Sequence, residues 1–110
     1  MRMTDPNDVQ LKKGALELCV LALLAQRESY AYEIASTLAE RVGMGEGTIY
    51  PLMRRMQSDG LVATWLVEST SGPSRKYYRL TAAGRTAYEA RSREWRSFVD
   101  AVDLFLGEME

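Results

Sequence analysis

Several side chains able to bind phosphate or base edges gather in one short segment and again about twenty residues later. Those in the first group carry hydroxyl and guanidinium groups, and those in the second are cationic: Thr48, Tyr50, Arg54 and Arg55, then Arg75 and Lys76. Guanidinium groups bind phosphate oxygens and read guanine edges, and hydroxyl groups donate to phosphates. On a solvated helix such residues are ordinary, so their meaning depends on the elements that present them.

The charge is unevenly distributed along the chain. The formal net charge is −1, yet residues 41–85 hold seven basic and three acidic side chains, a local net charge of +4. The rest of the chain carries seven basic and twelve acidic side chains. Because a phosphate backbone attracts local cations, the mildly acidic total is compatible with nucleic-acid binding.

The residue types exclude most familiar catalytic machinery. The 110 residues contain no His and one Cys, Cys19, which lies within an apolar run. A His/Cys metal site, a Cys-His pair and a Ser-His-Asp triad are therefore excluded, and no glycine-rich phosphate loop is present. We expect a protein that is not an enzyme and needs no metal or cofactor. Cys19 is expected to be a buried apolar residue, and a small domain without a disulfide indicates a reducing, cytoplasmic location.

The first part of the chain predicts a polar leader and then a helix. Residues 1–10 are polar and contain Pro6, and the pattern from Leu11 to Gln26 is helical but apolar on almost every side. The eight-residue apolar run is too short to span a membrane, which takes ~20 residues in a helix. A helix without a polar face must be covered all round, so we expect a second chain to contact Leu16 and Val20.

Two further helices are predicted on either side of a tight turn. Residues 30–42 have apolar side chains at helical spacing, and Gly43 suits the position after the helix end. Three glycines lie within residues 43–47, and residues 48–59 are again helical. Pro51 is tolerable only near a helix start, which places that start near residues 45–47.

The third predicted helix has two contrasting faces. At 100° per residue, one face is apolar and collects Ile49, Leu52, Met53 and Met56. The opposite face is polar, basic and aromatic, with Arg54 at its centre and Thr48, Tyr50 and Arg55 at its flanks. We expect this second face to be turned outward.

A hairpin and a long helix complete the predicted elements. Residues 62–69 and 75–81 are rich in β-branched and aromatic residues, and the turn-forming stretch 70–74 separates them. Thr81 suits an N-cap, and residues 82–109 predict a helix too long for so small a core. Its apolar residues repeat by heptads, with Arg91 as a basic exception, in two series: Tyr88, Trp95, Val102, Met109 and Phe98, Phe105.

The order of these elements predicts a mainly α fold with a small β-hairpin. It is that of a winged helix-turn-helix, residues 11–81, followed by a long C-terminal dimerisation helix, residues 82–110. A helix of this type fits the major groove of DNA, and a basic hairpin can follow the adjoining backbone. The predicted dimer interface comprises Leu16, Val20, Tyr88, Trp95, Phe98, Val102 and Phe105.

The sequence also resembles the PadR-type transcriptional regulators, from about Leu11 to the C-terminus. Four blocks carry the resemblance: Leu11–Leu16, Tyr30–Ile34, Gly47–Met56 and Gly72–Arg85. The single closing helix is similar to the short subgroup of that family. Gly45 stands where a Ser or Thr cap is common.

The resemblance implies a homodimeric, usually repressing regulator of a pseudo-palindromic operator in double-stranded DNA, released by a small, often aromatic effector. Carried over by position, Thr48, Tyr50 and Arg54 are the DNA contacts of the third helix. Tyr32 contacts the backbone from the second helix, and Arg75 and Lys76 act from the wing.

Two alternatives stay open at this point. Trp95 lies in the heptad seam, where two symmetry-related copies can flank an aromatic effector or simply pack against each other. The outward face of the third helix can serve an acidic protein partner instead of DNA, which would make the chain a winged-helix adaptor.

Overall fold

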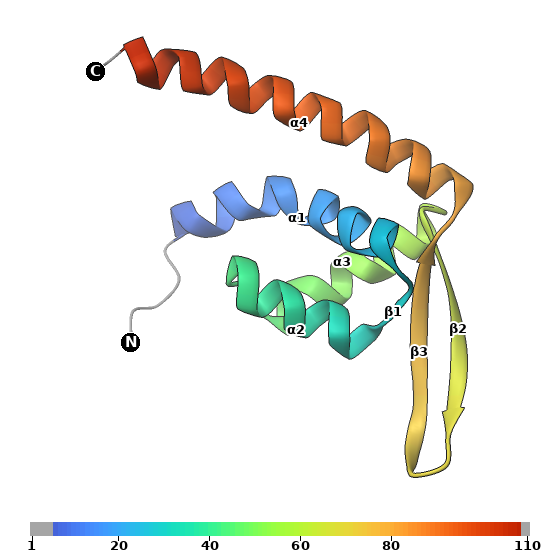
Figure 1. The fold of residues 1–110 in the computed structure, drawn as a ribbon. Helices are drawn as coiled ribbons and strands as arrows, with labels where there is room; N and C mark the ends of the chain where they lie inside the picture. The colour runs from blue at the N-terminus through green and yellow to red at the C-terminus, as the bar shows by residue number, and fades with distance from the viewer. Residues whose placement is uncertain (1–5, 109–110) are drawn as a thin grey trace.

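The computed structural model describes the backbone of residues 6–108 and the side chains of residue 12 and of residues 14–107. The remaining leader residues, 1–5, and the seam residue Met109 lie outside the described residues. Within the described part, four helices and a three-stranded antiparallel sheet form a winged-helix fold with a long final helix (Figure 1). The predicted fold class is confirmed.

Helix α1, Pro6–Gln26, is the central element of the molecule. It begins five residues earlier than the sequence indicated, so the assignment of residues 6–10 to a leader is wrong for the backbone. A proline at the first helical position explains this start, since its fixed φ suits a helix and its missing N–H would have no partner there. Helix α4 lies along one side of α1, and α2 and α3 lie along the other (Figure 1).

Helices α2, Ala31–Val42, and α3, Glu46–Ser58, form the helix-turn-helix. Gly43 ends α2 with a φ of 70°, which is the left-handed conformation that favours glycine, as predicted. Met44 in the turn is 3% exposed and anchors the turn in the core. Helix α3 starts directly after Gly45, which agrees with the start near residues 45–47 that was predicted from Pro51.

The core is built by α1, α2 and α3 and by the inner face of the sheet. Its apolar side chains come from α1, α2, α3 and the strands, and include Leu16, Val20, Leu21, Leu24, Ile34, Leu38, Ile49, Leu52, Met53, Met56, Val62 and Tyr78. Leu16 and Val20 are 2% and 1% exposed within the single chain. The expectation that a second chain covers these two residues is therefore wrong, because both lie in the core of the single chain.

The hairpin is a two-stranded wing with a third, short strand at its base. Strand β2, Val62–Ser69, has the predicted bounds, and β3, Gly72–Leu80, begins three residues earlier than predicted. Strand β1, Ser29–Tyr30, was not predicted and pairs antiparallel with Tyr77 and Tyr78 of β3. The strand order is β1-β3-β2, so the part of β3 nearest its tip has β2 on one edge and no strand of the described chain on the other.

The junction between the wing and α4 is fixed by hydrogen bonds. Thr81 Oγ1 accepts from the Gly84 N–H at 3.0 Å, which confirms Thr81 as the cap, and its hydroxyl donates to the Gly60 carbonyl at 2.6 Å. A side chain at position 84 would overlap the Leu61 carbonyl oxygen, so glycine is required there. Helix α4, Ala82–Glu108, leaves this junction and extends past the core (Figure 1).

Candidate nucleic-acid interface

Helix α3 presents its basic face to solvent. The inward residues Ile49, Leu52, Met53 and Met56 are at most 6% exposed, while Arg54 and Arg55 on the other side are exposed. Neither arginine forms an ion pair with any residue the structure describes. Their guanidinium groups are therefore available to an external anion.

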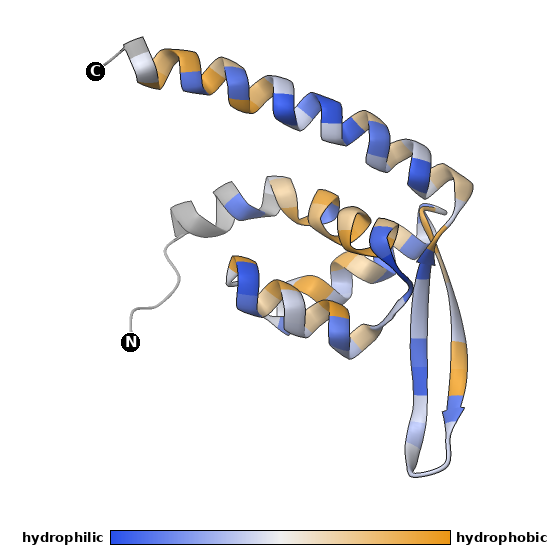
Figure 2. Ribbon diagram, viewed as in Figure 1, coloured by the Kyte–Doolittle hydropathy of each residue, from blue (hydrophilic) through white to orange (hydrophobic). Residues whose placement is uncertain are grey.

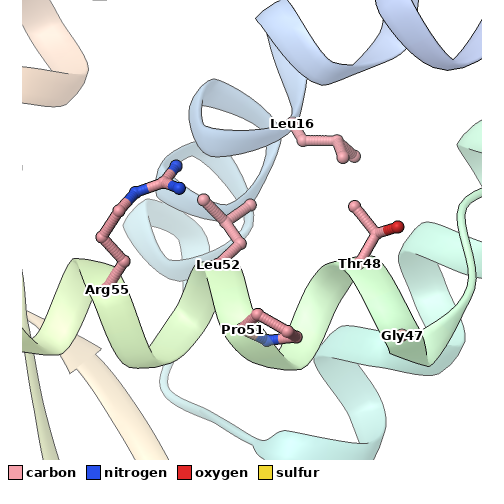
Figure 3. Close-up of a pocket in the computed structure, with 6 residues that line it drawn as sticks. All are labelled: Leu16, Gly47, Thr48, Pro51, Leu52 and Arg55. Carbon is pink, nitrogen blue, oxygen red and sulfur yellow. The ribbon is translucent and has the colours of Figure 1, made fainter.

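Thr48 and Arg55 lie on the flank of α3 that faces α1. They line a hollow of about 380 Å³ together with Leu16 of α1 and Leu52 (Figure 3). Both polar side chains extend from α3 toward the α1 side of this hollow, and Pro51 forms part of its wall (Figure 3). Thr48 and Arg55 thus lie on a different side of α3 from Tyr50.

Tyr50 lies on the flank of α3 that faces the wing. It lines a second hollow with six other residues: Tyr30, Ala31 and Tyr32 around the start of α2, and Ser74, Arg75 and Lys76 of β3. Partial burial, and to a lesser extent the Glu46 carboxylate, raise the pKa of the Tyr50 phenol. The phenol therefore stays protonated and able to donate a hydrogen bond at neutral pH.

The wing carries its cations on both faces of β3. Alternation places Tyr78 toward the core at 3% exposure, with Lys76 on the same face, and places Arg75, Tyr77 and Arg79 on the other. Tyr77 stacks on Trp65 of β2 with ring centroids 5.8 Å apart, which makes Trp65 a wing-packing residue.

Two residues that the sequence did not single out contact the wing cations. Tyr30 lies under the Arg75 guanidinium, and Gln57 of α3 accepts a hydrogen bond from Lys76. No short-range pattern in the sequence predicts either contact, because each joins residues that are at least nineteen positions apart. Only the folded arrangement brings them together.

The distal part of α4 exposes an apolar seam. Trp95, Phe98, Val102 and Phe105 are 40%, 63%, 37% and 71% exposed, and Tyr88 is half-buried against the core. Orange segments mark the hydrophobic residues along this end of the helix (Figure 2). The basic exception in the seam is explained, since Arg91 Nη1 lies 2.7 Å from Glu17 Oε1 of α1.

Trp95 also lines a hollow between α1 and α4 within the single chain. The lining includes Gly14, Leu18 and Phe98, with the Glu17–Arg91 ion pair at its side.

In the part of the chain that the structure describes, no helix meets the length and hydropathy needed to cross a membrane. No group of metal-binding side chains is found among those same residues.

Comparison with known proteins places the chain in a family. The profile described as "Transcriptional regulator PadR-like family" matches residues 20–90. A transcriptional regulator of Mycobacterium tuberculosis is 29% identical over 79 residues, which are 71% of this chain and 73% of that protein.

Solved structures agree with this placement. A PadR-like transcriptional regulator from Bacillus cereus is 37% identical with a TM-score of 0.80, covering 88% of this chain and 96% of that one. A PadR-like transcription factor from Bacteroides fragilis is 38% identical with a TM-score of 0.74, covering 92% of this chain and 99% of that one. The chain belongs to the PadR-like family of transcriptional regulators.

Proposed function

We propose that this chain binds double-stranded DNA, with α3 in the major groove and the wing on the adjoining backbone. The observation that carries the proposal is the solvent-facing side of α3, where Arg54 and Arg55 have no ionic partner among the described residues. A helix about 10–12 Å across fits a major groove ~12 Å wide.

The candidate contacts divide by position. Arg54 lies at the centre of the exposed face, where it would meet a base edge or a phosphate. Thr48 and Arg55 would reach the DNA strand that lies on the α1 side of the helix. Tyr32 and Tyr50 would reach the DNA strand that lies on the wing side. Arg75 and Lys76 would contact the backbone.

The same proposal includes a homodimer that represses from a pseudo-palindromic operator. The support is the α4 seam, whose aromatic residues Phe98 and Phe105 are more than half exposed. A two-fold symmetric protein reads two half-sites, so the operator symmetry follows from the dimer. A cytoplasmic location follows from the DNA target.

We further propose that a small aromatic effector releases the DNA by binding beside Trp95. The hollow at Trp95 has a volume of about 380 Å³, which is within the range of small-molecule sites. Packing of the two Trp95 side chains in the dimer is the competing role. An effector screen by tryptophan fluorescence, with Trp65→Phe to isolate Trp95, separates the two.

The test of DNA binding is a titration of the duplex upstream of the protein's own reading frame over a series of salt concentrations. Specific binding should weaken linearly in log salt and exceed binding to a shuffled duplex of the same composition. Equal binding to both duplexes at every salt concentration would reject the proposal. A winged-helix adaptor predicts a stable dimer with no duplex affinity, so the same titration distinguishes it.

A further inference from the structure

The hollow between the wing and the start of α2 is rich in groups that bind anions. Its volume is about 440 Å³, and it lies at the edge of β3 that no described strand covers. The lining residues are Tyr30, Ala31, Tyr32, Tyr50, Ser74, Arg75 and Lys76. Two carry a positive charge and four carry a hydroxyl group, and none of these described residues carries a carboxylate. Helix α2 begins at Ala31, so the positive end of its dipole also lies at this hollow.

Arg75 is held in place by the face of Tyr30. The guanidinium carbon lies 4.6 Å from the Tyr30 ring centroid, a cation–π contact. The centroids of the Tyr30 and Tyr77 rings are 5.6 Å apart, and the backbone N–H of Tyr30 donates a hydrogen bond to Glu33 Oε1 at 3.1 Å. The platform under Arg75 is thus fixed by β3 on one side and by α2 on the other.

Lys76 is held in place by Gln57. Lys76 Nζ donates to Gln57 Oε1 at 3.4 Å and lies 5.4 Å from the ring centroid of Tyr78, which is buried. Gln57 belongs to α3, the helix whose exposed face carries Arg54. The position of this wing cation is therefore tied to the helix that we propose enters the groove.

We infer that this hollow seats one backbone phosphate of the bound duplex, and that Tyr30 and Gln57 are positioning residues that preset Arg75 and Lys76 to receive it. The inference rests on the proposed function. It adds the place of one phosphate contact and a role for two uncharged residues, Tyr30 and Gln57. Ordering a long side chain before binding avoids its entropy cost on binding, a gain of about 2- to 10-fold in affinity for each cation.

The first experiment examines the free protein, without DNA. The Nε–H resonance of Arg75, assigned by its loss in Arg75→Ala, should show an aromatic ring-current shift in the wild type and in Tyr30→Phe, and should lose it in Tyr30→Leu. An Arg75 resonance at the same position in all three proteins would overturn the role of Tyr30. Because no duplex is present, this result does not depend on the proposed function.

The second experiment measures binding to the upstream duplex. Tyr30→Leu and Arg75→Ala should each weaken binding by about 2- to 10-fold per protomer, and the double variant should be no weaker than Arg75→Ala alone. Tyr30→Phe should bind like the wild type. Arg79→Ala is the matched control, since Arg79 lies on the same face of β3 and over Trp65 but outside the hollow, and it should bind within about 2-fold of the wild type.

If a thermal melt shows that Tyr30→Leu does not fold, Gln57→Ala provides the same test at an exposed residue. Lys76→Ala is then the second single variant of the double-mutant cycle. Ethylation interference then locates the phosphate: one position per half-site should hinder the wild type and not Arg75→Ala. If the wild type selects its duplex while Tyr30→Leu and Gln57→Ala bind equally well, the inference fails and the proposed function stands. If the wild type selects no duplex, the proposed function fails instead.

Discussion

Replacing Phe105 with alanine should separate the proposed dimer without unfolding the protomer. Phe105 is 71% exposed near the end of α4 and lies outside the core of the single chain. A phenylalanine side chain buries on the order of 150–250 Å² when fully covered, so the truncation removes about 100 Å² of apolar surface that a partner would cover. A symmetric dimer contains this contact twice.

The expected magnitude follows from that area. At about 25 cal/mol per Å², the loss is roughly 2.5 kcal/mol per protomer and about 5 kcal/mol for the pair. The dimer dissociation constant should therefore rise by roughly 4,000-fold, since each 1.4 kcal/mol is about tenfold. Sedimentation equilibrium over a concentration series measures this change, and a circular dichroism melt should show a folded protomer.

Leu104→Ala is the control for the register of the seam. Leu104 is 68% exposed and adjacent to Phe105, but it belongs to neither heptad series. Its truncation should change the dissociation constant much less. The reasoning is refuted if the wild type is a monomer at micromolar concentration, or if Leu104→Ala weakens the dimer as much as Phe105→Ala does.

Three further outcomes are expected. Arg54→Ala should weaken binding to the upstream duplex by about 1–3 kcal/mol and relax selectivity at one base pair if Arg54 reads a base; unchanged affinity in the salt titration would contradict its place in the interface. Gly84→Ala should lower the free energy of unfolding in urea by about 1–3 kcal/mol, because the new methyl group overlaps the Leu61 carbonyl. The control Gly14→Ala, which meets open space in α1, should not lower it, and equal destabilisation of both variants would refute the argument. Burial raises the pKa of the Cys19 thiol, so the thiolate fraction at pH 8 is smaller in the folded protein and iodoacetamide should label Cys19 more slowly than in urea, as followed by mass spectrometry. Equal labelling rates would contradict this.

The parts of the fold that the sequence predicted are those with local periodicity. The inward face of α3 repeats every three or four residues, and β2 is rich in β-branched and aromatic residues and is followed by a turn-forming stretch, so both were located to within a few residues. Gly43 and Thr81 also act locally, through a left-handed φ and a hydrogen bond three residues on. Such features depend on neighbouring residues, which a sequence displays directly.

The parts that the sequence missed depend on distant segments. Strand β1 consists of Ser29 and Tyr30, and it is a strand only because Tyr77 and Tyr78 lie beside it. The apolar pattern of α1 predicted an external partner for Leu16 and Val20, whereas both lie in the core of the single chain, where Leu16 lines a hollow with Thr48 and Leu52 of α3. An all-round apolar helix indicates complete burial but does not indicate which chain supplies the cover.

Protection of guanine N7 from dimethyl sulfate tests the central claim most directly, because N7 lies in the major groove where α3 would be placed. On the upstream duplex, the wild type should protect guanines in two clusters about one helical turn, or ~34–36 Å, apart, and Arg54→Ala should lose part of each cluster if Arg54 reads a guanine. Binding that leaves every guanine N7 reactive while adenine N3 in the minor groove becomes protected would show that α3 does not read this duplex.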